Sequence, residues 1–102
     1  MISDLTQQLN KVFHDRVRLA IMSTLVATEE EKSFSELVDM LDLTRGNLSV
    51  HARVLEKHGY IEIKKAFVDN KPKTTFKATK AGRDAFEQYI TLLEQIIKGI
   101  QS

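Results

Sequence analysis

The sequence has no cysteine among its 102 residues, and this absence removes several classes of protein from consideration. A disulfide-stapled scaffold, thiolate chemistry and every zinc site built on cysteine are excluded. No apolar run approaches the roughly 20 residues that a membrane-spanning helix needs. The amino-terminal stretch lacks the basic head and apolar segment of a signal peptide, so we expect a cytoplasmic protein that does not enter a membrane.

The sequence also has little net charge, +1, but that charge is unevenly distributed along the chain. Residues 1–43 contain four Lys and Arg against eight Asp and Glu, whereas residues 44–80 contain nine against three. A basic middle third indicates a positively charged face. The length, with 42% hydrophobic and 28% charged residues, predicts one globular domain spanning residues 1–102.

Apolar residues at intervals of three and four predict helices over 1–14, 15–27, 33–42, 45–58 and 80–99. Ser33 with Glu36 has capping-box spacing, Thr44 and Thr79 are good N-cap residues, and Gly59 suits a helix end. The period then falls to two over residues 61–78, around the turn-rich residues 69–72, which predicts a β-hairpin of undetermined register. The fold class is therefore mostly α with a hairpin.

Two helices joined by a short turn, followed by a hairpin, predict a winged helix-turn-helix with a three-helix core. The segment LDLTRGNLSVHARVLEKHGYI (41–61) resembles the recognition segment of the ArsR and MarR families of transcriptional regulators. ATKAG (78–82) is similar to the step that closes their wing, and HDRVRLAIMSTL (14–25) is similar to their first core helix. The resemblance implies a small, one-domain winged-helix regulator that binds DNA.

The helix over 45–58 has an apolar face formed by Leu48, Ala52 and Leu55, and that face should point inward. A recognition helix must offer its other face to base edges in the major groove. The side chains on that face can bond to guanine, adenine, phosphate or a thymine methyl group. The residues expected to contact DNA on this helix are Arg45, Gly46, Asn47, Ser49, Val50 and Arg53.

The hairpin, 61–78, is rich in lysine and should supply the electrostatic part of binding. Lys65, Lys71 and Lys73 are the expected DNA contacts, the last two beside the turn. If each protomer neutralises three or four phosphates, a dimer should show a slope of roughly −5 to −7 in log K against log salt. Taken alone, such lysines also protect strand edges against aggregation.

The last helix has an apolar stripe that a domain this small cannot cover. We expect segments 1–14 and 84–102 to form a two-fold dimer seam; the alternative is that the first and last helices pair within a monomer. A symmetric dimer would place its recognition helices about 34 Å apart. The expected interface residues are Leu5, Leu9, Phe13, Tyr89, Leu93, Ile96, Ile97 and Ile100.

Other functions have less support in the sequence. There is no phosphate-binding glycine loop and no Ser/His/Asp grouping, so no enzyme is predicted. His51 and His58 lie about 10 Å apart along their helix, too far to share a metal, and no metal or cofactor is expected. The alternative function is a winged-helix protein-interaction module without DNA readout. The sequence leaves a small-molecule effector open and indicates none.

Overall fold

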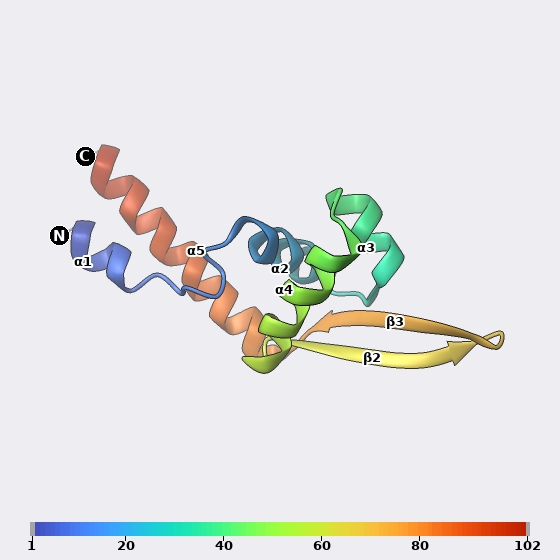
Figure 1. The fold of residues 1–102 in the computed structure, drawn as a ribbon. Coiled ribbons are helices and arrows are strands. Elements are labelled where there is room, and N and C mark those ends of the chain that lie inside the picture. Colours follow the sequence, from blue (N-terminus) through green and yellow to red (C-terminus); the bar gives the residue numbers. More distant parts are fainter. Residues whose placement is uncertain (1, 102) are drawn as a thin grey trace.

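The computed structural model describes residues 2–101, within which it has five helices and a three-stranded antiparallel sheet. The hairpin projects from one end of the helical body and the two chain ends lie at the other (Figure 1), so that the Cα trace measures 57 × 25 × 21 Å. The elements are α1 (Ile2–Gln7), α2 (Arg16–Thr28), β1 (Lys32–Ser33), α3 (Phe34–Leu41), α4 (Arg45–Lys57), β2 (Ile61–Val68), β3 (Lys71–Ala78) and α5 (Lys80–Gln101).

Side-chain caps fix where the three core helices begin. Asp15 accepts the backbone N–H of Arg18 at 3.0 Å at the start of α2. Ser33 and Glu36 form the expected capping box before α3, with both bonds at 3.1 Å. Thr44 accepts from the backbone at 3.0 Å and starts α4. These caps satisfy N–H groups that have no partner within a helix, which is why the short α3 begins where it does.

The turn of the wing is shorter than the sequence predicted. Asp69 and Asn70 have φ values of 53° and 63°, and the strands pair up to Val68 and Lys71. Two consecutive positive φ values define a type I′ turn, whose twist matches that of the strands. The predicted four-residue turn is therefore wrong, because Lys71 and Pro72 belong to β3.

The sheet also contains a third strand that the sequence analysis did not predict. Strand β1 pairs with β3 through Lys32 opposite Phe76 and Ser33 opposite Thr75, in the order β1-β3-β2. Two residues are too few to display an alternating pattern, so periodicity could not reveal this strand. Its effect is to hold the base of the wing against the start of α3.

The predicted first helix is correct only at its beginning. Helix α1 ends at Gln7, and Asn10 accepts the backbone N–H of Val12 at 2.9 Å. Such a local side-chain bond competes with helical hydrogen bonding. The turn directs Phe13 into the core, where it is fully buried with its ring centroid 4.8 Å from that of Tyr60.

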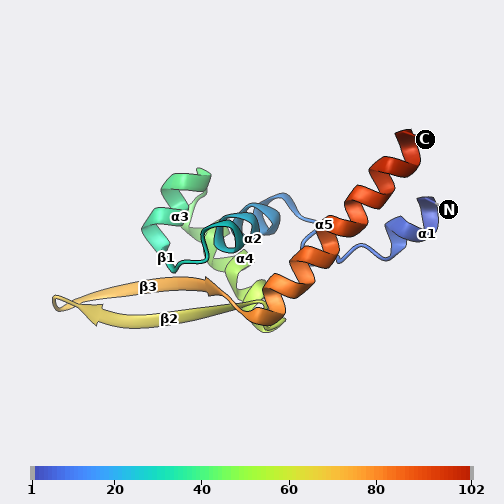
Figure 2. The ribbon, with the colours of Figure 1, turned by 180° about the vertical axis from the view of Figure 1, so that it is seen from behind.

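The ATKAG segment (78–82) forms the junction between the wing and α5. Thr79 donates to the carbonyl of Gly59 at 2.6 Å and accepts from the N–H of Gly82 at 2.9 Å. Gly82 lies so close to the carbonyl of Tyr60 that a Cβ atom would overlap it. Helix α5 begins at this contact, packs against the core with its first half and continues toward α1, as Figure 2 shows. Among the described residues, no helix is long and apolar enough to cross a membrane.

Candidate nucleic-acid interface

Helix α4 has the inward and outward faces that the sequence predicted. Leu48, Ala52 and Leu55 are at most 1% exposed and belong to the core. The opposite face is open to solvent, and Val50 is 62% exposed. Of the α4 residues expected to contact DNA, only Ser49 is half-buried. The others are exposed: Arg45, Gly46, Asn47, Val50 and Arg53.

The structure brings the outer face of α4 and the wing together around two neighbouring hollows. Arg45, Lys71 and Lys73 line the first, beside the start of α3. The second lies between α4 and the hairpin and is lined by residues that include Ser49, Arg53 and Lys65. Phe34 and Thr74 line both hollows, so they adjoin. A polyanion lying along α4 would meet cations from both elements.

Arg45 has a partner that sequence reasoning missed. Its guanidinium lies 4.6 Å from the centroid of the Phe34 ring, within the range of a cation–π interaction. Phe34 in turn lies on Phe76 of β3, with ring centroids 6.0 Å apart. The stack holds Arg45 on the side of α4 that faces the wing. No local pattern in the sequence could show this, because Phe34 and Arg45 are on different helices.

Helix α4 is attached to α2 through His51. Its Nδ1 lies 3.0 Å from Nη1 of Arg18 and 3.7 Å from the Asp15 carboxylate. Arg18 also donates to the carbonyl of Val12 at 2.6 Å. The backbone N–H of Arg18, together with the positive charge of that side chain, lowers the pKa of Asp15 below its usual value of 3.8. Polar contacts therefore fix α4 from behind and leave its outer face free.

The expected dimer residues fall into three groups. Phe13 and Tyr89 are 0% and 3% exposed, and Ile96 is 8% exposed. Their own chain already covers them, so assigning them to a seam between chains was wrong. Leu5, Leu9 and Leu93 are half-buried. Ile97 and Ile100 remain 51% and 67% exposed. Met1 and Ser102, the outer ends of the two predicted segments, lie outside the described residues.

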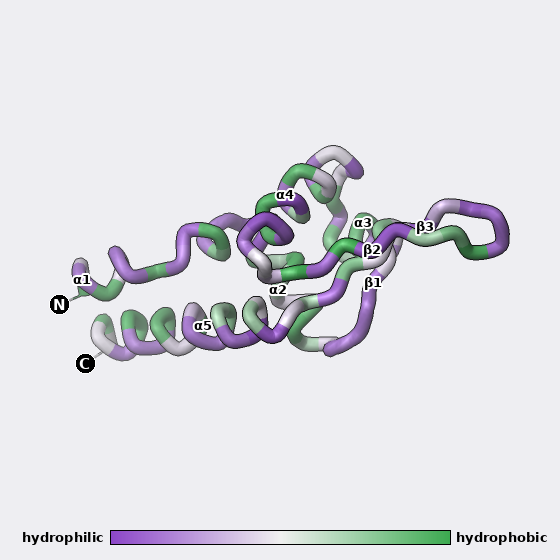
Figure 3. Tube along the Cα trace, turned by 90° about the horizontal axis from the view of Figure 1, so that it is seen from below, coloured by the Kyte–Doolittle hydropathy of each residue, from purple (hydrophilic) through white to green (hydrophobic). Residues whose placement is uncertain are grey.

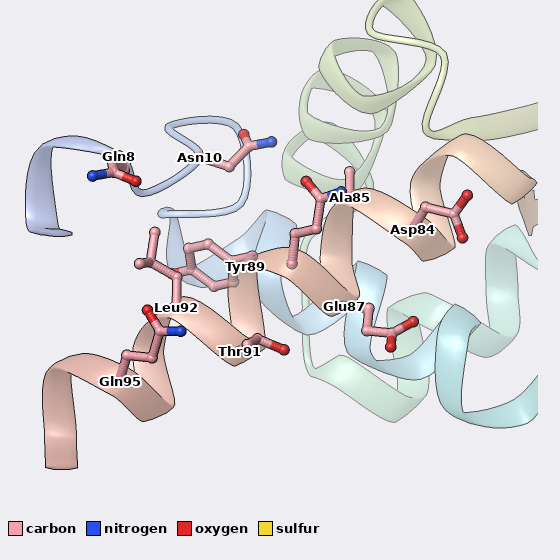
Figure 4. Close-up of a pocket in the computed structure, with 10 residues that line it drawn as sticks. Gln8, Asn10, Asp84, Ala85, Glu87, Tyr89, Thr91, Leu92 and Gln95 are labelled. Atoms are coloured by element: carbon pink, nitrogen blue, oxygen red, sulfur yellow. The ribbon is translucent and has the colours of Figure 1, made fainter.

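Helix α1 lies beside α5 within the chain (Figures 1 and 2). A hollow separates residues 8–10, which follow α1, from α5 (Figure 4). The hollow is lined mainly by amide and carboxylate side chains, together with Tyr89. The Tyr89 hydroxyl lies 2.9 Å from His14 Nδ1, and burial raises the pKa of this tyrosine. Among the described residues, no three His, Asp or Glu side chains are arranged to hold a metal ion.

A sequence model of the winged helix DNA-binding domain matches residues 17–97. The chain belongs to this family. An uncharacterized protein from Methanocaldococcus jannaschii is 38% identical to this winged helix domain over 91 residues, which are 89% of this chain and 98% of that protein. A transcriptional regulator homologue from Pyrococcus horikoshii OT3 superposes with a TM-score of 0.86 at 30% identity, over 98% of this chain and 96% of that one.

A more distant structure shares the fold of this winged helix domain. The heme sensor protein PefR from Streptococcus agalactiae, solved with heme, has a TM-score of 0.74 at 19% identity. That match covers 90% of this chain and 63% of PefR. The expected winged helix fold, of the kind found in transcriptional regulators, is therefore confirmed.

Proposed function

We propose that this winged helix domain binds double-stranded DNA sequence-specifically, as a homodimeric transcriptional regulator in the cytoplasm. The observation that carries the proposal is the shared open face of α4 and the wing. There, Arg45 and Arg53 of α4 adjoin Lys65, Lys71 and Lys73. An exposed helix face flanked by cations suits major-groove readout with phosphate contacts beside it.

The side chains on α4 have separate roles in this proposal. Arg53 lies midway along the exposed face and can make a bidentate bond to guanine, while Asn47 can do the same with adenine. Val50 provides an apolar contact for a thymine methyl group. Arg45, held beside Lys71 and Lys73, would instead contact the backbone. Specificity would therefore come from Asn47, Val50 and Arg53, and affinity from Arg45 and the wing.

The homodimer is supported by the apolar surface that α1 leaves uncovered on α5. Ile97 and Ile100 are each more than half exposed and lie three residues apart near the end of α5. Figure 3 shows hydrophobic stretches recurring along this helix up to the chain end. A two-fold axis here would pair the last turns of two α5 helices. The two copies of α4 would then read a palindrome with half-sites about one duplex turn apart.

Selection of bound duplexes from a random pool tests the proposal directly. We expect an enriched palindromic sequence, bound more tightly than an unrelated duplex. Arg53→Ala should cost about 1–3 kcal/mol of binding and relax the preference at one position in each half-site. Lys98→Ala, on α5 far from α4, is the matched control and should bind normally. If wild-type protein shows no mobility shift on duplex DNA at low salt, the proposal fails and a protein-interaction module is favoured.

A further inference from the structure

The outer part of the wing carries an apolar surface as well as lysines. Phe67 is 79% exposed and Val68 49% exposed, and both precede the turn. Figure 3 shows this hydrophobic stretch next to the hydrophilic turn. Single exposed apolar residues are ordinary. Here Ala66, Phe67 and Val68 are consecutive, Pro72 lies opposite, and all four are exposed.

The register determines which way Phe67 points. Opposite residues share a face of an antiparallel pair, so Phe67 lies with Pro72, on the same face as the Lys65–Thr74 pair. The same face continues inward to Ile63, which packs at the core. Lys65 and Thr74 also line the hollow beside α4. Phe67 is therefore on the face that would look toward a duplex docked on α4.

The opposite face of the wing carries Val68, Lys71 and Lys73. Val68 is thus an apolar neighbour of Phe67 on the other face of the strand pair, and with Lys71 and Lys73 it lines the hollow that contains Arg45. The turn between the strands contains Asp69, whose carboxylate would be repelled by phosphates. That charge disfavours insertion of the turn end-on and leaves the sides of the wing available for contact.

The reach of the wing is of the same order as the spacing of the two DNA grooves. Phe67 lies four residues beyond Ile63 in β2, which is about 13 Å of extended strand. The minor groove is displaced from the major groove by half a repeat, about 17 Å along the duplex. Pro72 and the type I′ turn stiffen this part of the hairpin. Pro72 also suits its position, because β1 pairs only with Thr75 and Phe76 and leaves this edge open.

We infer that Phe67, backed by Pro72, is an apolar wedge that enters the DNA minor groove and partly unstacks one base step. Minor-groove proteins use apolar side chains in this way, and flexible pyrimidine–purine steps open most readily. Phe67 would thereby select sequence by deformability at positions that α4 does not touch. This inference rests on the proposed DNA binding and adds a specificity-determining residue to it.

The test uses the selected duplex with single adenines replaced by 2-aminopurine, whose fluorescence rises when its base is unstacked. Saturating wild-type protein should brighten the probe at one position outside each α4 contact. Phe67→Ala should abolish the brightening and weaken binding about tenfold, as alanine does at base-stacking aromatics. Val68→Ala is the matched control from the opposite face and should brighten the probe as wild type does.

The outcomes separate this inference from the function on which it rests. If wild-type protein forms no complex with DNA, both fail. If the complex forms but the probe stays dark at every position, only the wedge is overturned. Equal brightening by wild type and Phe67→Ala overturns it too, as does loss of brightening in Val68→Ala. Circular dichroism of the free variants should show unchanged folding, since both side chains are exposed.

Discussion

The strongest quantitative consequence of the structure concerns the salt dependence of DNA binding. Lys71 and Lys73 share a hollow with Arg45, and we assign these cations to phosphates. Replacing both lysines by alanine in a dimer removes four potential phosphate contacts. Each lost contact reduces the slope of log K against log salt by about 0.9, so the total reduction is about 3.5.

The wild-type slope of roughly −5 to −7 should therefore shrink to about −1.5 to −3.5 in the Lys71→Ala, Lys73→Ala variant. Raising the salt from 50 to 200 mM would then weaken wild-type binding by about 10³ to 10⁴, and variant binding by only about 10 to 100. Fluorescence anisotropy with the selected duplex, titrated at five or six KCl concentrations, measures both slopes.

The control variant Lys98→Ala removes one positive charge per protomer from α5 and should leave the slope unchanged. The reasoning is refuted if the double variant binds more weakly at low salt but keeps the wild-type slope. That result would mean that the two lysines act on folding or on wing conformation rather than on phosphates. Because the sign and size follow from counting charges, a small unspecific loss of affinity cannot mimic the expected change.

Three further predictions concern stability and assembly. Gly82→Ala should destabilise the fold by about 1–3 kcal/mol in urea unfolding, because its Cβ would overlap the Tyr60 carbonyl; Gly46→Ala, with open space around it, should not. Asp15→Ala should cost about 1 kcal/mol at pH 7. The folded pKa of Asp15 lies below 3.8. The difference in the free energy of unfolding between wild type and variant should therefore persist above pH 3.8 and shrink as the pH falls through the folded pKa. A difference that stays constant with pH would contradict this prediction. Ile97→Asp should convert a dimer to a monomer in light scattering, and an unchanged mass would exclude this seam.

The sequence predicted the structure most accurately where a side chain interacts with residues close to it in the chain. The Ser33–Glu36 box and the Thr44 cap depend on residues three apart, and the inward face of α4 follows from a regular spacing. These features need no knowledge of the rest of the fold. The winged helix arrangement also followed, because the change of period after Gly59 marks the start of the hairpin.

The errors arose where distant contacts override a local pattern. Phe13 continues a helical stripe in the sequence, yet the aromatic cluster at the start of α5 draws it into the core and ends the helix early. The same aromatic cluster buries Tyr89, which the apolar stripe of the last helix had assigned to a dimer seam. Phe67 was overlooked because the predicted turn was two residues too long, which left the register undefined. Recognising Asp69-Asn70 as a two-residue turn would have assigned Phe67 to an exposed pair.

The segment between α1 and α2 connects the two ends of this molecule. Asn10 donates to the Tyr60 hydroxyl at the base of the wing at 3.0 Å, and His14 contacts Tyr89 of α5. Arg18, at the start of α2, reaches back to this segment and forward to His51 of α4. The recognition helix, the wing and the proposed dimer helix are thus tied to one short stretch of chain.

These ties have a consequence for a dimer built on α5. The separation of the two α4 helices would be set by how rigidly each α5 is held to its own domain. The substitution Tyr89→Phe removes only the hydroxyl bond to His14 and keeps the packing of the ring. We expect the variant to remain dimeric but to tolerate half-site spacings one base pair longer or shorter than wild type does. Unchanged spacing preference in a repeated selection would show that packing of the rings, and not this hydrogen bond, holds the two ends in place.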